Sequence, residues 1–174
     1  IFQVVSQLRA SMTPQDVMLI FDTKGDFYRE FYQTGDIVIS NDAKATGQDG
    51  RDYWNLFGEI GEGDAIEADL IEIAKTLFRE RSQKSSQPFF PNAARDLFCA
   101  ILTHFIRSGA SRLLNNASLR TFLDQANAAE LRTLLQLHPD MASMVSYIND
   151  DRSPQTQGVL SELQQKVREI FIGN

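Results

Sequence analysis

The feature that most constrains the fold of this chain is a change in hydrophobic pattern near residue 53. Downstream of it, apolar residues recur at helical spacing, and no segment shows the pattern of a β-strand. Upstream, continuous apolar runs at 17–21 and 37–39 enclose a short amphipathic stretch at 27–32. Such runs are typical of strands that are buried on both faces. The sequence therefore predicts a mainly α protein, a helical bundle preceded by a small parallel β-α-β element.

Several of the expected helices begin at capping residues. Asp64 and Asn127 each precede a glutamate by three residues, which is the capping-box pattern, and Ser153 precedes a first-turn proline. The most apolar segment, 91–106, is expected to form the central helix and to stop at Gly109. A polar linker at 82–87 is expected before it. The expected helices span 64–81, 91–106, 118–124, 127–137, 139–148 and 153–171.

The segments outside the helical part have simpler patterns. Apolar residues at 1, 4, 5 and 8 follow helical spacing with no capping residue before them, so we expect a helix that begins upstream and a chain cut from a longer protein. A proline-containing turn follows at 13–16. Residues 40–52 are rich in Asn, Asp and Gly and are expected to form a loop.

Composition narrows the function classes. The 174 residues carry a formal charge of −6, which argues against a domain that grips nucleic acid with its whole surface, while a local basic patch stays open. The single cysteine, Cys99, excludes an intrachain disulfide and multi-cysteine metal sites. We expect Cys99 and His104 to be packing residues and His138 to serve a helix junction, so no metal site is expected. Phe89 and Phe90 are either exposed recognition aromatics or clamps onto the core.

The sharpest local motif is Asp22-Thr23-Lys24-Gly25-Asp26, directly after the first apolar run. Ligand chemistry in α/β folds sits at the C-terminal ends of parallel strands, so Asp22, Lys24, Gly25 and Asp26 are candidates for the neighbourhood of a nucleotide site. The alternative is a turn with a solvated aspartate and a glycine at positive φ. No Gly-x-x-x-x-Gly-Lys-Ser/Thr phosphate loop occurs in the 174 residues. We therefore expect no catalytic residue and no nucleotide hydrolysis by this chain alone.

Charge is segregated around the first long expected helix. Between 49 and 72 there are eight acidic side chains and one basic one, and a compact basic cluster follows. The acidic stretch is either a solvated face or a docking face for a basic partner segment. The basic cluster either stabilises a helix C-terminus or contacts DNA. The candidate partner-binding residues are Glu67, Asp69, Glu72, Arg79, Arg81 and Lys84.

Several motifs taken together resemble the type IV secretion coupling proteins, the membrane-anchored ATPases of bacterial conjugation and effector export. The resemblance in order and spacing covers about 17–106. Its motifs are Asp22-x-Lys24-Gly25-Asp26 after a strand, Phe27 with Phe31, Gly35-Asp36, Asn41-x-Ala43, Trp54-Asn55, Glu59-Ile60 and Phe90-x-x-Ala93-Ala94-Arg95-x-Leu97-Phe98.

The resemblance implies that 1–40 is a fragment of a RecA-like nucleotide-binding motor domain, 41–52 a loop and 53–174 an all-α cargo-recognition domain. It implies relaxase or effector protein cargo as partners, with DNA as a further candidate, and no direct membrane contact by this segment. No cofactor is expected in this segment, because ATP and Mg²⁺ would belong to the parent protein. That parent would be a homo-hexamer anchored in a bacterial inner membrane. The all-α domain of the parent would face the cytoplasm.

Two other interpretations stay open. The chain could be a segment of a nucleotide-dependent DNA translocase in which Asp22, Lys24 and Asp26 act at the ATP site. It could also be a structural helical adaptor with no cargo role.

Overall fold

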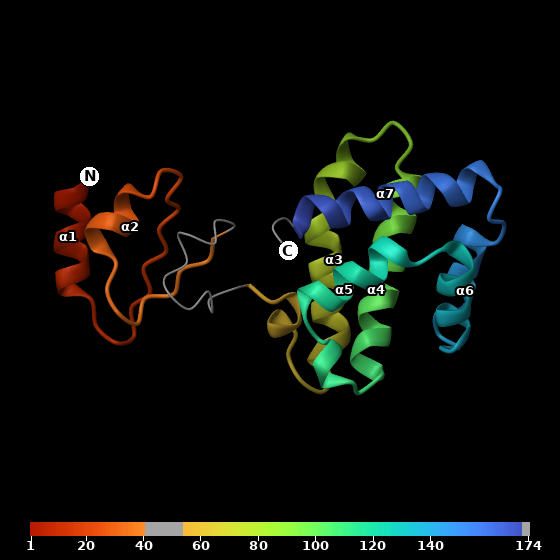
Figure 1. Cartoon of the computed structure of the whole chain (residues 1–174), viewed down its shortest axis with the longest axis horizontal. Helices are drawn as coiled ribbons and strands as arrows, with labels where there is room; N and C mark the ends of the chain where they lie inside the picture. Colours follow the sequence, from red (N-terminus) through yellow and green to blue (C-terminus); the bar gives the residue numbers. More distant parts are fainter. Residues whose placement is uncertain (41–53, 172–174) are drawn as a thin grey trace. The chain divides into compact units, whose positions relative to one another are not determined.

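The computed structural model describes residues 1–40 and 54–171, which belong to two compact units, Ile1–Tyr53 and Trp54–Asn174 (Figure 1). The expected boundaries of a motor fragment, a loop and an all-α domain stay predictions, and the expected loop at 41–52 lies outside the described residues.

The N-terminal unit contains two helices, α1 (Phe2–Ser11) and α2 (Asp26–Phe31). The ring of Phe2 lies edge-on to Phe27 and Phe31, with centroids 5.1 and 5.5 Å away. An ion pair adds a second link, because both carboxylate oxygens of Asp36 accept hydrogen bonds from Arg9, at 2.8 and 2.6 Å. One aromatic cluster and one ion pair therefore join α1, α2 and the turn that follows α2.

The predicted β-α-β element is wrong for the described residues. Residues 17–21 and 37–39 are extended, yet neither forms a strand. Alternate side chains of the first run point into solvent, and Val17, Leu19 and Phe21 are 93%, 96% and 91% exposed. A continuous apolar run favours burial of its side chains, but a strand also needs a neighbouring backbone to pair with. The described chain supplies none for residues 17–21.

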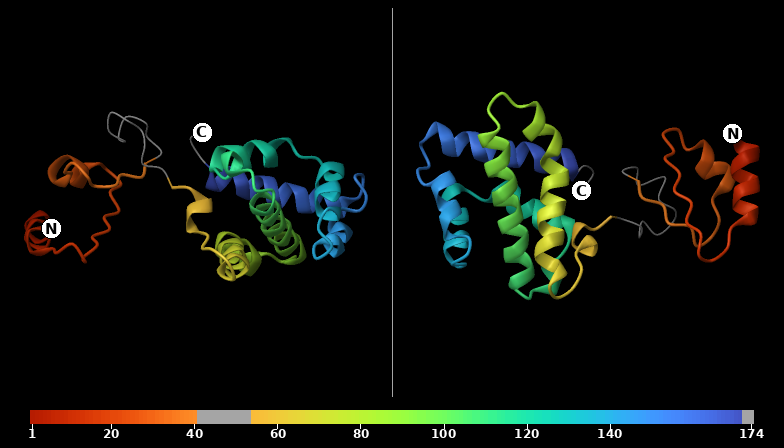
Figure 2. Two further views of the ribbon diagram at one scale, coloured as in Figure 1. Left: turned by 90° about the horizontal axis from the view of Figure 1, so that it is seen from below. Right: turned by 180° about the vertical axis from the view of Figure 1, so that it is seen from behind.

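The helical unit is built on two neighbouring helices, α3 (Ala65–Lys84) and α4 (Phe89–Arg107), which lie side by side (Figure 2). Phe78 of α3 and Phe98 of α4 are both fully buried, and their rings are 5.7 Å apart. Helix α4 is the central one, as predicted. Its buried residues are Pro91, Ala93, Ala94, Leu97, Phe98, Ala100, Ile101, Leu102 and Phe105.

The last helix, α7 (Pro154–Ile170), packs on α4 and contacts α5 (Asn116–Gln125). Helix α6 (Ala128–Gln136) follows α5 and packs on α4 as well. Figure 1 shows α7 running across the α3–α4 pair. Three short 3-10 segments complete the described unit: η1 (Leu56–Glu59), η2 (Ser111–Leu113) and η3 (Ala142–Ile148). The fold of the described residues is thus mainly α.

The capping residues predicted for the helix ends are confirmed at some helices and wrong at one. Asn127 forms a full capping box with Glu130, and the Ser153 hydroxyl accepts the backbone N–H of Thr156 at 3.1 Å. Asp64 makes no side-chain cap bond, because it already has helical φ and ψ. Gly109, at φ +66°, follows the end of α4 as predicted.

Two helix predictions need correction. Helix α3 continues to Lys84 and so absorbs half of the expected polar linker, because nothing in that stretch forbids helix. The expected α-helix at 139–148 is a turn followed by η3. No helix among the described residues is long and apolar enough to span a bilayer.

The point where the chain enters the helical unit is fixed by two asparagines. The side chain of Asn55 donates to the carbonyl of Leu114 at 3.1 Å, and the backbone N–H of Leu56 donates to Asn116 at 3.0 Å. Asn116 also donates to the carbonyl of Trp54. These bonds fasten η1 to the start of α5 and leave Leu56 fully buried.

Candidate functional site

The loop before α2 is organised by the carboxylate of Asp22. Its Oδ1 accepts the backbone N–H of Gly25 at 2.9 Å and of Lys24 at 3.3 Å, and its Oδ2 accepts that of Tyr28 at 2.8 Å. The bond from Tyr28 contributes most to holding the pKa of Asp22 below its ordinary value. Gly25 has φ +74°, a conformation that glycine adopts without strain. Asp22 therefore closes a turn at the start of α2.

The other residues of this motif point elsewhere. Asp26 pairs with Arg29 within α2, and Lys24 is exposed with no polar partner for its side chain in the described segments. The four candidate residues lie together, as a capped helix start. Their assignment to the neighbourhood of a nucleotide site stays a prediction.

The acidic candidates lie on the first half of α3 and differ in their contacts. Asp69 accepts the backbone N–H of Gly61 at 2.9 Å, which fixes the loop that leads into α3. Glu67 and Glu72 are exposed, and neither forms a hydrogen bond or an ion pair among the described residues, although Glu67 interacts at longer range with Arg107. We use the name acidic surface for Glu67 and Glu72. These are the carboxylates that are free to meet a partner.

The structure divides the predicted basic cluster. The guanidinium of Arg81 points toward α7, where it donates to Glu162 at 3.0 Å and to Gln165 at 3.3 Å and pairs with Glu169. The Glu169 bond is the main cause of the raised pKa of Arg81. Lys84 pairs with Glu80 one turn back, whereas Arg79 is exposed and unpaired in the part of the chain that is described. Arg81 therefore links two helices, and of the three cations Arg79 alone is free.

A neighbouring cation was missed by the sequence reasoning. Lys75 lies one helical turn before Arg79, is exposed, and has no charged partner in the described ranges. Residues four apart share a helix face, so the spacing could have singled out this pair. We call Lys75 and Arg79 the cationic pair. Helix α3 thus carries free carboxylates in its first half and free cations in its second.

The two histidines, expected to act separately, form a pair. His104 Nδ1 and His138 Nε2 lie 2.9 Å apart across the contact between α4 and the end of α6. Burial, and then the neighbouring imidazole, lowers the pKa of His104. Cys99 is half-buried, and desolvation raises the pKa of its thiol. Among the described residues, no group of three or more His, Cys, Asp or Glu could hold a metal ion.

The aromatic candidates mainly clamp the helices. Phe57 stacks on Phe105, with ring centroids 6.1 Å apart, and Phe90 is half-buried where α4 meets Gly158 of α7. The more exposed Phe89 lies edge-on to Tyr147 at 6.0 Å. Packing on neighbouring helices is therefore the main role of these rings.

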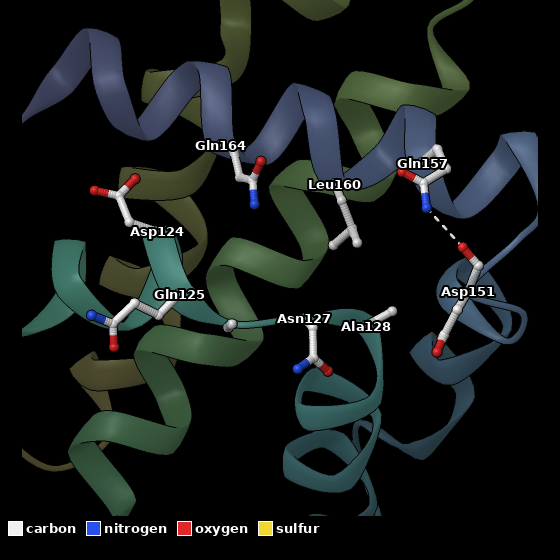
Figure 3. A pocket seen from close by; sticks show the side chains of 9 residues that line it. Asp124, Gln125, Asn127, Ala128, Asp151, Gln157, Leu160 and Gln164 are labelled. Atoms are coloured by element: carbon white, nitrogen blue, oxygen red, sulfur yellow. Dashed lines mark hydrogen bonds between the residues drawn. The ribbon is translucent and has the colours of Figure 1, made fainter.

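A polar groove lies between α7 and the junction of α5 with α6 (Figure 3). Its volume is about 360 Å³. The figure shows Gln157, Leu160 and Gln164 of α7 on one side and Gln125 and Asn127 at the junction on the other, with the side chains of Gln125 and Asn127 pointing away from α7. Asp124 and Asp151 lie toward opposite ends. The remaining lining residues are Ala126 and Ala128.

The carboxylates of the groove are already paired, while its carboxamides keep free hydrogen-bonding groups. Asp151 pairs with Arg132, and Asp124 accepts from Arg120 at 3.4 Å. The side chains of Gln125 and Gln164 have no partner within 54–171, the described part of this unit. Gln157 donates to the carbonyl of Asp151 at 2.7 Å, which leaves its own amide oxygen open. The groove therefore offers both donors and acceptors.

A comparison with known protein families identifies the family of this chain. Residues 2–172 match the model described as the type IV secretion-system coupling protein DNA-binding domain. No curated protein matches the chain. No solved structure matches it either.

Proposed function

This chain belongs to the type IV secretion-system coupling protein DNA-binding domain family, and on that premise we propose that its helical unit selects the cargo for transfer. The cargo would be a relaxase with its attached DNA strand or an effector protein. The observation that carries this proposal is the division of charge on α3 between the acidic surface and the cationic pair. A partner of either sign would meet a complementary part of the same helix.

Protein cargo would use the acidic surface. Glu67 and Glu72 are exposed and free of local pairing, so a basic segment can approach them without displacing an existing ion pair. The net charge of −6 favours such a partner at long range. Asp69 would act indirectly, since its carboxylate holds the loop at Gly61.

DNA would use the cationic pair. Most other basic side chains of α3, α4, α5 and α6 are held by carboxylates within the unit, as Arg81, Lys84, Arg107 and Arg132 illustrate. A phosphate backbone near Lys75 and Arg79 meets two free cations instead. We therefore propose a small, strongly salt-dependent DNA contact there.

The N-terminal unit would be a piece of the nucleotide-binding motor domain. Its extended runs expose Val17, Leu19 and Phe21, as strands do when the rest of their sheet belongs to another segment. The residues around Asp22 do not fit a nucleotide with Mg²⁺ by themselves, because both carboxylate oxygens accept backbone N–H groups. ATP and Mg²⁺ would belong to the parent protein, and no catalytic step is assigned here.

Two charge-reversal variants test the proposal. Glu67→Lys with Glu72→Lys should weaken binding of a cognate cargo protein, whereas Lys75→Glu with Arg79→Glu should weaken DNA binding. The second variant removes two phosphate-binding cations, so the slope of log affinity against log salt should fall by roughly two. Fluorescence anisotropy with labelled cargo and with a labelled oligonucleotide gives both affinities.

The matched control reverses Arg112 and Arg152, two exposed cations outside α3. It should leave both affinities near those of the unchanged chain. If all three variants bind cargo and DNA with the affinities of the unchanged chain, the charges on α3 only face solvent. That result would remove the main support for cargo selection.

A further inference from the structure

We propose that α5 clamps the two ends of the helical unit to each other, so that loosening either end loosens the other. The clamp consists of two positioning residues, Asn116 and Arg120, which hold residues 54–56 and Phe171 respectively. It concerns the helical unit alone and does not depend on which cargo that unit selects. The clamp would make the two ends of the unit a single mechanical junction.

The N-terminal end of the unit is held by both polar atoms of the Asn116 carboxamide. Its Oδ1 accepts the backbone N–H of Leu56 at 3.0 Å, and its Nδ2 donates to the carbonyl of Trp54 at 2.5 Å. Asn55 adds a third bond, from its own amide to the carbonyl of Leu114 at 3.1 Å. Leu56 and Asn116 are 60 residues apart in the sequence, so these bonds fasten the entering segment to α5 and are not part of a local turn.

The C-terminal end of the unit is held by the guanidinium of Arg120. Its Nη1 donates to the carbonyl of Phe171 at 2.6 Å. That carbonyl follows the last turn of α7, where carbonyl groups lack partners within the helix. A weaker bond from Nε to Asp124, at 3.4 Å, orients the guanidinium, and Asp124 lies 4.0 Å from Arg168 of α7. Arg120 therefore fastens the end of α7 to α5.

Asn116 and Arg120 lie one turn apart on the same face of α5. Residues four apart on a helix are neighbours, so a shift of one is passed to the other. Leu119 and Leu123 are fully buried and anchor α5 in the core. Figures 1 and 2 show the entering segment, the start of α5 and the end of α7 on one side of the unit. A displacement at one end therefore reaches the other through a single helical turn, because packed interiors transmit strain.

The alternative to a clamp is a pair of independent ties, each of which satisfies backbone groups only at its own end. In the described residues, Arg120 forms no hydrogen bond or ion pair with 54–58, and Asn116 forms none with 165–171. Two independent ties would therefore be felt only locally. An effect that crosses from one end to the other distinguishes the clamp, and it should run in both directions, because coupling between two sites is reciprocal.

Amide hydrogen exchange, measured by NMR on the whole chain, tests the coupling. Three backbone amides report on the two ends: those of Leu56 and Gly58 at the first, and that of Phe171 at the second. Arg120→Ala should speed exchange at the first end, and Asn116→Ala should speed it at the second. Each rate should rise by about fivefold, the scale of one lost hydrogen bond. The double variant should change these rates by less than the two single variants combined, because each substitution already loosens both ends.

The matched control is Arg132→Ala, which removes a bond of the same kind on another helix. Arg132 of α6 donates to the backbone carbonyl of Ile148 at 2.8 Å. This variant should leave the three reporting amides at their original rates. Amides of the central helix, such as those of Phe98 and Ile101, should keep their rates in every variant, which separates a local opening from general unfolding.

A milder variant, Asn116→Asp, keeps the acceptor for Leu56 and removes the donor to Trp54. It should also speed exchange at Phe171, so the test does not depend on how well Asn116→Ala folds. The proposal is overturned if each substitution changes exchange only at its own end, or if the two single effects simply add. It is also overturned if the control produces the same changes, or if exchange rises uniformly across the unit.

Discussion

At the scale of single residues, the contacts of His104 make stability depend on pH. Burial and the facing His138 lower the pKa of His104 below its usual value of about 6.5. The unfolded chain then binds this proton more readily than the folded one. The stability linked to a lowered histidine pKa is fully present at pH values above the pKa of the unfolded chain. It is lost as the pH falls from that pKa toward the lower pKa of the folded chain.

We therefore expect the melting temperature to fall when pH is lowered from 7 toward 5, a range above the ordinary carboxyl pKa values. The substitution His104→Gln should flatten this slope, because it removes the titrating group and keeps a side chain that can bond to His138. Calorimetric scans at half-unit pH steps measure the effect. A slope that is unchanged in the variant would assign the pH dependence to other groups.

Arg81 shows why sequence proximity misled the prediction of a basic cluster. At about 100° per residue, side chains two apart on a helix point in nearly opposite directions. Arg79 therefore faces solvent, while Arg81, with 22% of its side chain exposed, faces Glu162 and Glu169 of α7. The contact with α7 lies beyond what local spacing can predict, because it depends on a helix some 80 residues away.

We expect Arg81→Ala to destabilise the helical unit by roughly 1 kcal/mol, the scale of a partly exposed ion pair. It should leave DNA affinity nearly unchanged, whereas Arg79→Ala should lower that affinity with little cost in stability. Urea unfolding and anisotropy on the same two variants measure both quantities. If Arg81→Ala lowers the DNA affinity and leaves the stability unchanged, Arg81 would instead belong to the partner-binding surface.

At the scale of elements, the sequence predicted most helices and their caps, and it failed on the strands. Helix formation is largely local, so periodicity and capping residues such as Asn127 and Ser153 carry enough information. Strand formation needs a partner backbone, which the apolar run at 17–21 does not have in the described chain. The groove escaped prediction for a related reason, since it forms only where α7 packs beside the junction of α5 with α6.

The contact between α4 and α7 depends on the absence of a side chain at Gly158. A Cβ built there would lie 2.6 and 2.7 Å from the Cε1 and Cδ1 atoms of Phe90. Helix propensity favours alanine by about 1 kcal/mol, while overpacking costs about 1–3 kcal/mol. We expect Gly158→Ala to lower the free energy of unfolding by up to about 2 kcal/mol.

Combining Gly158→Ala with Phe90→Ala tests that explanation. With the ring gone, the added methyl should be neutral or stabilising, and the two substitutions should show a favourable coupling in denaturant unfolding. Simple additivity would mean that the ring of Phe90 moves aside freely and that Gly158 is not required for the contact.

At the scale of the whole molecule, the two units differ in how much apolar surface they bury. The helical unit has a continuous core that includes Leu97, Phe98 and Ile101, each nearly inaccessible to solvent. The N-terminal unit has no fully buried residue in α1 or α2, and Val17, Leu19 and Phe21 of its first extended run are exposed. Burial is the main favourable contribution to stability, so the helical unit should be the more stable one.

Amide hydrogen exchange on the whole chain should therefore be faster at 17–40 than at 94–106. Central-helix amides are protected by helical bonds within a packed core and exchange through large openings, whereas residues 17–21 form no ladder within the described chain and open locally. Mass spectrometry of peptides from both regions, at several protein concentrations, measures the difference. Equal protection that appears only at high concentration would mean that a second copy pairs with the extended runs. Equal protection at every concentration would mean that these runs are paired within one chain, and the N-terminal unit could then no longer be interpreted as a piece of a larger sheet.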